Sequence, residues 1–195
     1  MQDSFALLGE ARRPWLDVGL LKESFLKQCA QAHPDRFTSP KEKAAAQSRF
    51  AELNAAHETL RSTKRRLQHL LTLERGVKPS DIHDIPAALA DVFVEIMELV
   101  QRVDRFLAAR QSLPSALLKA REQAAALEWW EKVEALRARL NAQQQALDAS
   151  LQQLSVSWRN PTPEIWEKVE QAYHQASYLS RWRGLLQERS LRLSQ

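Results

Sequence analysis

The residue types best suited to chemistry stand together at His33, Pro34 and Asp35. An imidazole can donate or accept a hydrogen bond, and a carboxylate can pair with a basic group. Proline fixes its own backbone angle and pushes the preceding histidine toward extended geometry, so we expect a stiff tripeptide. The sequence contains no glycine-rich phosphate loop and no recognisable nucleophile–base motif. We therefore expect His33 and Asp35 to act on another molecule, and we assign no catalytic residues.

Two amphipathic helices must position this tripeptide. The helix before it is indicated by apolar residues at spacings of four, four and three: Leu21, Phe25, Cys29 and Ala32. The helix after it carries a second apolar stripe: Phe50, Leu53, His57 and Leu60. Pro34 and Pro40 prevent the first helix from continuing through the polar connection at 33–39. The tripeptide is therefore predicted at the tip of a helical hairpin.

Capping residues indicate where these helices begin and end. Asp17 is a suitable N-cap for the helix before the tripeptide. Ser39 followed by Pro40 predicts the start of the helix after it, because proline is favoured at the first helical position. A leucine-rich stretch then predicts a fourth, short helix that ends at Gly76.

Beyond Gly76 the chain changes character, and we divide it into three parts: a first domain at 1–75, a linker at 76–86 and a second domain at 87–195. The second domain reads as three long helices in an antiparallel bundle, so the predicted fold class is all-α. The first bundle helix has the apolar row Leu89, Val92, Ile96, Leu99, Val103 and Phe106. The last has the row Ile165, Val169, Ala172, Ala176, Leu179, Leu186 and Leu193. The middle region, 115–157, is either one long helix or a helix that bends near Asn141.

The composition argues against several classes of site. Cys29 is the only cysteine and falls on an apolar stripe, so we predict a core residue and no disulfide. The five histidines show no metal-ligand spacing, and we predict no metal and no cofactor. No stretch approaches the ~20 apolar residues of a membrane span, and the first residues do not resemble a secretory signal. We expect a cytoplasmic protein that is not an enzyme and has no membrane partner.

The positive charge is concentrated in the first domain. Residues 1–75 hold 13 Lys+Arg and 9 Asp+Glu, whereas residues 76–195 hold 15 of each. This imbalance favours docking of the first domain on an acidic protein surface. The basic residues do not interleave with exposed aromatics, so nucleic-acid binding is not predicted.

The first domain resembles a J-domain, the module that stimulates ATP hydrolysis by DnaK-type chaperones. Residues Phe5–Gly9 are similar to the first helix of that family, and Asn54–His57 to part of its third helix. The resemblance implies that the chaperone is bound by the tripeptide and by a basic face: His33, Pro34, Asp35, Lys22, Lys27 and Arg36. Leu26 and Gln31 stand where many J-domains are basic, so this basic face is thinner than usual.

The first bundle helix is apolar beyond its core row. Around the helix axis, Phe93 and Met97 lie at a large angle from that row, and Val94 lies at a larger one. These residues stand among the polar residues Glu98 and Gln101. An extra apolar face must be buried somewhere. It either packs on the first domain or binds a partner.

Several segments resemble the HscB co-chaperones of iron–sulfur cluster assembly: Val92–Val103, Leu70–Leu73, Glu164–Trp166 and Tyr178–Ser180. The resemblance implies a DnaK/HscA-type ATPase as the chaperone and an IscU-like scaffold protein as the client. We use the name client patch for the residues that would bind this scaffold: Phe93, Val94, Met97, Glu98, Gln101 and Tyr178. The chain departs from the family at Gln101 and Arg105, where acidic residues are common. A J-domain protein with an unrelated client, or a helical interaction adaptor, remains the alternative.

Overall fold

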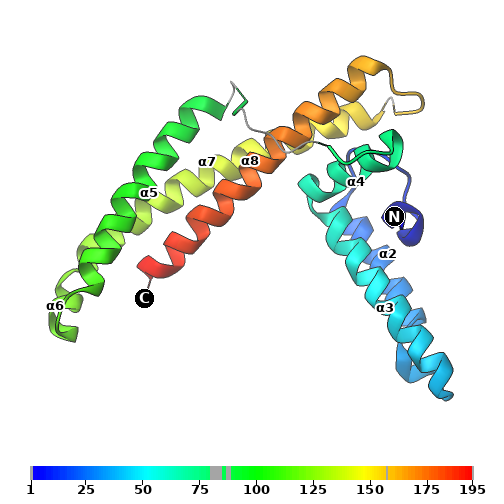
Figure 1. Cartoon of the computed structure of the whole chain (residues 1–195), viewed down its shortest axis with the longest axis horizontal. Coiled ribbons are helices and arrows are strands. Elements are labelled where there is room, and N and C mark those ends of the chain that lie inside the picture. Colours follow the sequence, from blue (N-terminus) through cyan, green and yellow to red (C-terminus); the bar gives the residue numbers. More distant parts are fainter. Residues whose placement is uncertain (1, 80–84, 87–88, 157, 195) are drawn as a thin grey trace. The chain divides into compact units, whose positions relative to one another are not determined.

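The computed structural model describes residues 2–79, 85–86, 89–156 and 158–194. Every regular element in these residues is helical, which confirms the all-α prediction (Figure 1). The first part of the chain contains α1 (Ser4–Leu8), α2 (Val18–Gln31), the 3₁₀ turn η1 (Pro34–Arg36), α3 (Pro40–Arg61) and α4 (Thr63–Arg75). The second part contains α5 (Ala90–Gln111), α6 (Ala116–Arg121), α7 (Gln123–Val156) and α8 (Pro163–Leu193).

The predicted capping residues of the hairpin are confirmed. The Asp17 carboxylate accepts from the backbone N–H groups of Gly19 and Leu20 at 2.8 and 3.1 Å. The Ser39 hydroxyl accepts from the N–H of Glu42 at 3.3 Å, at the start of α3. Gly76 ends α4 with a φ of +73°, which residues with a Cβ adopt at a cost. These local signals set the start of α2, the start of α3 and the end of α4.

A buried arginine joins α4 to its neighbours. Arg66 is 2% exposed, and its guanidinium donates to the carbonyl oxygens of Pro14 at 2.9 Å and Leu60 at 2.8 Å. Burial lowers the pKa of Arg66 to about 10, and the charge of Asp148 opposes that shift. The side chain is therefore still charged at neutral pH, and it satisfies carbonyl groups that would otherwise be buried without a donor.

The chain forms two packing units. The first joins residues 1–81 with 148–173, and the second joins residues 82–147 with 174–195. Within the first unit, the Trp15 N–H donates to the Ser155 hydroxyl at 3.1 Å and the Trp158 indole N–H donates to the Arg12 carbonyl at 2.6 Å. The end of α7 and the start of α8 belong to the unit that contains the hairpin. The predicted functional division at 75 and 87 stays a prediction, and linker residues 80–84 lie outside the described residues.

The second unit is built on α5, α6 and parts of α7 and α8. The buried row of α5 consists of Leu89, Val92, Ile96, Val100, Val103 and Leu107. The predicted row placed Leu99 and Phe106 in the core, and these two positions are only half-buried. The reason is the helical period: the observed row advances as a straight α-helix of 3.6 residues per turn does, whereas the prediction followed a strict heptad.

The sequence left open whether the middle region is one long helix or a helix that bends near Asn141. The structure has one uninterrupted helix that continues through Asn141. That helix, α7, has no glycine or proline from Gln123 to Val156, so nothing in its sequence breaks the backbone hydrogen bonds. At ~1.5 Å per residue it is roughly 50 Å long. Its start is set by a break at Glu122, which separates it from α6.

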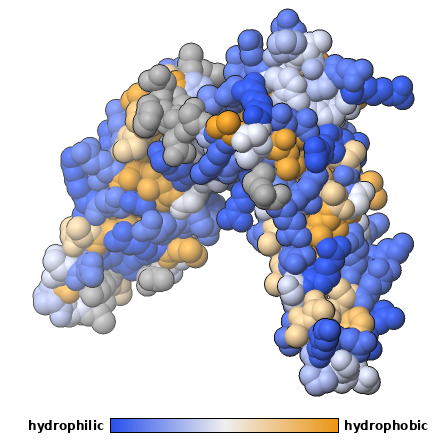
Figure 2. Space-filling model, turned by 45° about the vertical axis from the view of Figure 1, so that its right-hand side comes forward, coloured by the Kyte–Doolittle hydropathy of each residue, from blue (hydrophilic) through white to orange (hydrophobic). Residues whose placement is uncertain are grey.

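Figure 2 shows a surface that is mostly hydrophilic, with apolar residues gathered in small areas. Within the described part of the chain, no helix has both the length and the apolar character needed to cross a membrane.

The burial of His69 on α4 makes stability dependent on pH. His69 Nε2 accepts from the Ser4 N–H of α1 at 3.0 Å, and burial lowers the pKa of His69 below 6.5, a shift that the charge of Asp3 opposes and the charge of Arg12 reinforces. A histidine with a lower pKa in the folded state binds fewer protons there than when unfolded. We therefore expect the free energy of unfolding to fall as pH drops below about 6.5, until the folded-state pKa is reached. Thermal unfolding at a series of pH values should show this loss, and a smaller one in His69→Gln. An equal loss in the variant would contradict the assignment.

Candidate partner-binding sites

The His-Pro-Asp tripeptide forms the turn at the end of the α2–α3 hairpin (Figure 1). His33 caps η1, because its Nδ1 accepts from the Asp35 N–H at 3.3 Å. An imidazole that accepts at Nδ1 carries its proton on Nε2, so this N–H can donate to a partner. The His33 ring also packs edge-on against Phe50, with the centroids 6.2 Å apart. The histidine is thus held by its neighbours on both sides.

Asp35 is more exposed than His33 in this turn. Its side chain is 89% exposed, and its carboxylate lies 3.6 Å from His33 Nδ1. A carboxylate in this position retains most of its acceptor capacity for a partner's basic group. The turn therefore presents one acceptor and one donor on a stiff backbone.

The three basic residues assigned to the chaperone contact are all exposed. Arg36 also has a structural role, because its guanidinium donates to the carbonyl oxygen of Ala30 at 3.2 Å, near the end of α2. This bond connects the turn to the helix before it. Lys22 and Lys27 lie on α2 itself and make the basic face that the sequence predicts.

Five of the six residues of the client patch lie on α5. Val94 and Met97 are 55% and 45% exposed, Phe93 is half-buried, and Glu98 and Gln101 are exposed. These five residues, together with Val100 and Asp104, line one shallow groove on the helix surface. The structure therefore brings the predicted α5 residues together on one face.

Tyr178, the sixth residue of the client patch, is only 8% exposed. Its ring lies 5.4 Å from that of Trp182, and Trp182 lies 5.9 Å from Phe93, centroid to centroid. Tyr178 is thus connected to the client patch indirectly, because its ring contacts Trp182 and the Trp182 ring contacts Phe93. The sequence analysis did not single out Trp182, although it follows Tyr178 by one helical turn and so lies on the same face of α8.

The acidic groups at the edge of the client patch are paired with arginines. Glu98 lies 3.8 Å from Arg102, and Asp104 lies 2.9 Å from Arg189. The Asp104 carboxylate also raises the pKa of Arg189 through a hydrogen bond and its charge. The centre of the patch is therefore apolar, and its acidic edge is largely neutralised.

The structure offers no features of a metal centre or a thiol nucleophile among the described residues. No group of three or more histidine, cysteine, aspartate or glutamate side chains is arranged to hold a metal ion there. Cys29 is buried, and burial raises the pKa of its thiol, which keeps it protonated and unreactive.

No protein-family model matches the sequence. A segment of 104 residues is 34% identical to the mitochondrial J-type co-chaperone jac1 of Schizosaccharomyces pombe, and it covers 53% of this chain and 43% of that protein. A segment of 76 residues is 41% identical to the HscB homologue of Aeromonas hydrophila, a co-chaperone, and it covers 38% of this chain and 44% of that protein. Each match thus spans less than half of the relative's own length.

Two solved structures have the same fold as this chain. HscB from Vibrio cholerae aligns over 96% of both chains with a TM-score of 0.56 and 23% identity. Human HscB aligns over 96% of this chain and 82% of its own with a TM-score of 0.61 and 18% identity. The resemblance to HscB-type co-chaperones is confirmed. At these identities the structural likeness concerns the fold alone, so the two groups of site residues stay predictions.

Proposed function

We propose that this HscB-like chain is a co-chaperone in iron–sulfur cluster assembly. In this proposal the hairpin stimulates ATP hydrolysis by a DnaK/HscA-type chaperone, and the client patch delivers an IscU-like scaffold protein. The observation that carries the proposal is the exposed Asp35 on a stiff turn, in a chain similar in sequence to J-type and HscB co-chaperones.

The hairpin supports the first half of this function through its geometry. His33 is held by its bond to the Asp35 N–H and by its contact with Phe50 before any partner arrives, so this residue loses little conformational entropy on binding. The chain itself carries out no hydrolysis in this account. It changes the conformational state of the chaperone, whose own active site cleaves ATP.

The client patch supports the second half of the proposed function, the binding of a scaffold protein. Val94 and Met97 expose apolar surface on a rigid helix, and Phe93 rests on Trp182. A central apolar cluster with a polar edge is the arrangement that protein interfaces favour. A scaffold protein with an apolar surface segment would fit it.

The alternative is a J-domain protein with an unrelated client, or an adaptor without a chaperone. Affinity capture with the intact chain distinguishes these functions, because the proposal requires both an ATPase chaperone and a cluster scaffold among the captured proteins.

The predicted cytoplasmic location stays a prediction, since the name of one relative places that protein in mitochondria.

The basic face of α2 should affect how fast the chaperone associates. Lys22 and Lys27 are exposed, so their attraction is screened over about 8 Å at physiological salt. We expect the association rate to fall as salt rises, and Lys27→Glu to lower it about tenfold at low salt. Stopped-flow binding measures this rate. The matched control is Lys168→Glu, which reverses an exposed charge on α8. An association rate independent of both salt and Lys27 would contradict the steering role.

A further inference from the structure

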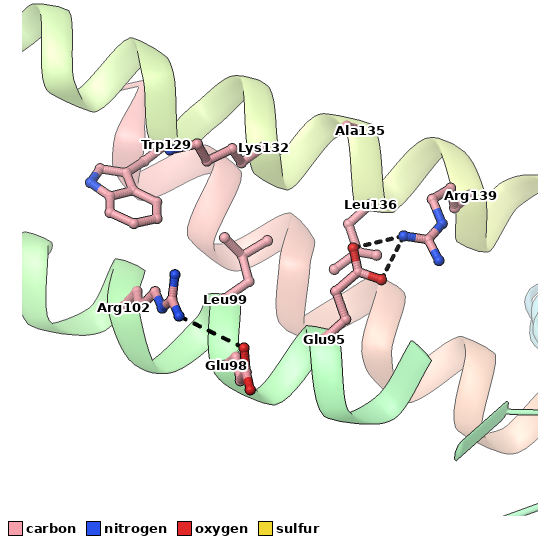
Figure 3. Close-up of a pocket in the computed structure, with 9 residues that line it drawn as sticks. All are labelled: Glu95, Glu98, Leu99, Arg102, Trp129, Lys132, Ala135, Leu136 and Arg139. Atoms are coloured by element: carbon pink, nitrogen blue, oxygen red, sulfur yellow. Dashed lines mark hydrogen bonds and ion pairs between the residues drawn. The ribbon is translucent and has the colours of Figure 1, made fainter. Parts of the chain in front are cut away.

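A second groove lies between α5 and α7, on the opposite side of Glu98 from the client-patch groove. Figure 3 shows Leu99 of α5 and Leu136 of α7 pointing into it, with the indole of Trp129 at one end. The groove has a volume of about 350 Å³, within the range of ligand and side-chain pockets. Its inner surface is thus apolar and aromatic.

The charges around this groove do not cancel. Glu95 pairs with Arg139 at 2.7 Å, and Glu98 pairs with Arg102 at 3.8 Å (Figure 3). The remaining cation, Lys132, lies 4.5 Å above the centre of the Trp129 ring and makes no salt bridge with another described residue. An ammonium held against an aromatic face retains donors for an incoming anion. The groove therefore favours a carboxylate next to an apolar group.

The groove is continuous with the client patch. Glu98 lines both recesses, and the α5 residues of one recess alternate along the helix with those of the other. A protein surface laid along α5 would cover both. The two recesses differ in charge, because Glu98 and Asp104 at the edge of the client patch are paired with arginines, whereas the second groove has the surplus cation Lys132.

We propose that the groove between α5 and α7 is a second contact for the scaffold protein that the client patch binds, an inference that rests on the proposed function. It accepts an acidic side chain of that partner at Lys132, while an apolar neighbour of that side chain packs against Trp129 and Leu99. Trp is one of the residue types that are enriched at the energetic centre of protein interfaces. The two recesses together fix the direction in which the partner lies along α5.

The test compares the affinities of variants for an IscU-type scaffold protein by titration calorimetry. Lys132→Glu is expected to weaken binding about tenfold, because it replaces an attraction with a repulsion. Its melting temperature should be unchanged, since the side chain is exposed. Trp129→Ala should weaken binding to a similar degree. The matched control, Arg121→Glu, makes the same charge change at an exposed residue of α6 outside both grooves and should bind as the wild type.

The outcomes separate this contact from the proposed function. Wild-type affinity in both groove variants, with weakened binding in Met97→Ala, would overturn the second contact and leave the proposed function standing. An equal loss in Arg121→Glu and Lys132→Glu would show a general charge effect and would also overturn it. A scaffold that fails to bind the wild-type chain would overturn both. If the groove variants change only self-association in sedimentation, the groove belongs to a second copy and the contact is refuted.

Discussion

Asp35→Asn is expected to reduce stimulation of the chaperone's ATP hydrolysis to the background rate while the fold stays intact. The substitution removes a charge and keeps the shape of the side chain. Because the carboxylate is 89% exposed and forms an ion pair with no described residue other than His33, its loss should change the free energy of unfolding by less than about 0.5 kcal/mol. Single-turnover hydrolysis measures the stimulation, and circular dichroism measures the helical content.

A second variant and a control make this result specific to the turn. His33→Gln removes the imidazole that caps η1 and should abolish stimulation as well. Glu42→Gln neutralises an exposed carboxylate in the first turn of α3 and should stimulate like the wild type. Normal stimulation by either turn variant would refute the role of the tripeptide.

Met97→Ala should weaken binding of an IscU-like scaffold by about 1–3 kcal/mol, as the loss of a central interface residue does. The side chain is 45% exposed, so its truncation should scarcely lower the melting temperature. Phe93→Ala should affect both quantities, because Phe93 also stacks on Trp182 inside the unit. Met97 is therefore the cleaner probe of the client patch.

A matched control for Met97 is Leu191→Ala, which truncates an apolar side chain of similar exposure, 54%, on α8. Scaffold titration and thermal unfolding on the same protein samples give both readouts. Leu191→Ala should leave the affinity unchanged. A large loss of stability with unchanged scaffold affinity in Met97→Ala would mean that this face belongs to the folded core.

The sequence predicted those features that depend on local chemistry. The caps at Asp17 and Ser39 and the left-handed glycine at Gly76 each act within one helical turn, so the residue types alone are sufficient. The turn at His33 was found for the same reason, because proline acts on its own backbone and that of its neighbour. The extra apolar face of α5, with Phe93, Val94 and Met97, followed from angular position along one helix, whereas its assignment to a scaffold protein came from the resemblance to HscB.

Features that depend on contacts between distant segments were not predicted. The bonds from Trp15 to Ser155 and from Trp158 to Arg12 join residues about 140 positions apart, and no periodic pattern encodes such a pairing. Trp182 was overlooked because an aromatic residue on a core face looks like ordinary packing until its neighbours Phe93 and Tyr178 are in place. Predicting that Val100 and not Leu99 lies in the core would have required the actual helical period of the structure.

Single-turnover ATP hydrolysis by a DnaK/HscA-type chaperone, measured with and without an IscU-like scaffold, tests the central claim most directly. The wild-type chain should raise the rate, Asp35→Asn should not raise it under either condition, and Met97→Ala should act like the wild type until scaffold is added. With scaffold present, Met97→Ala should need about 5- to 150-fold more scaffold for the same effect, the factor that a loss of about 1–3 kcal/mol in affinity corresponds to. A wild-type chain that leaves the hydrolysis rate unchanged at every concentration would contradict the co-chaperone function.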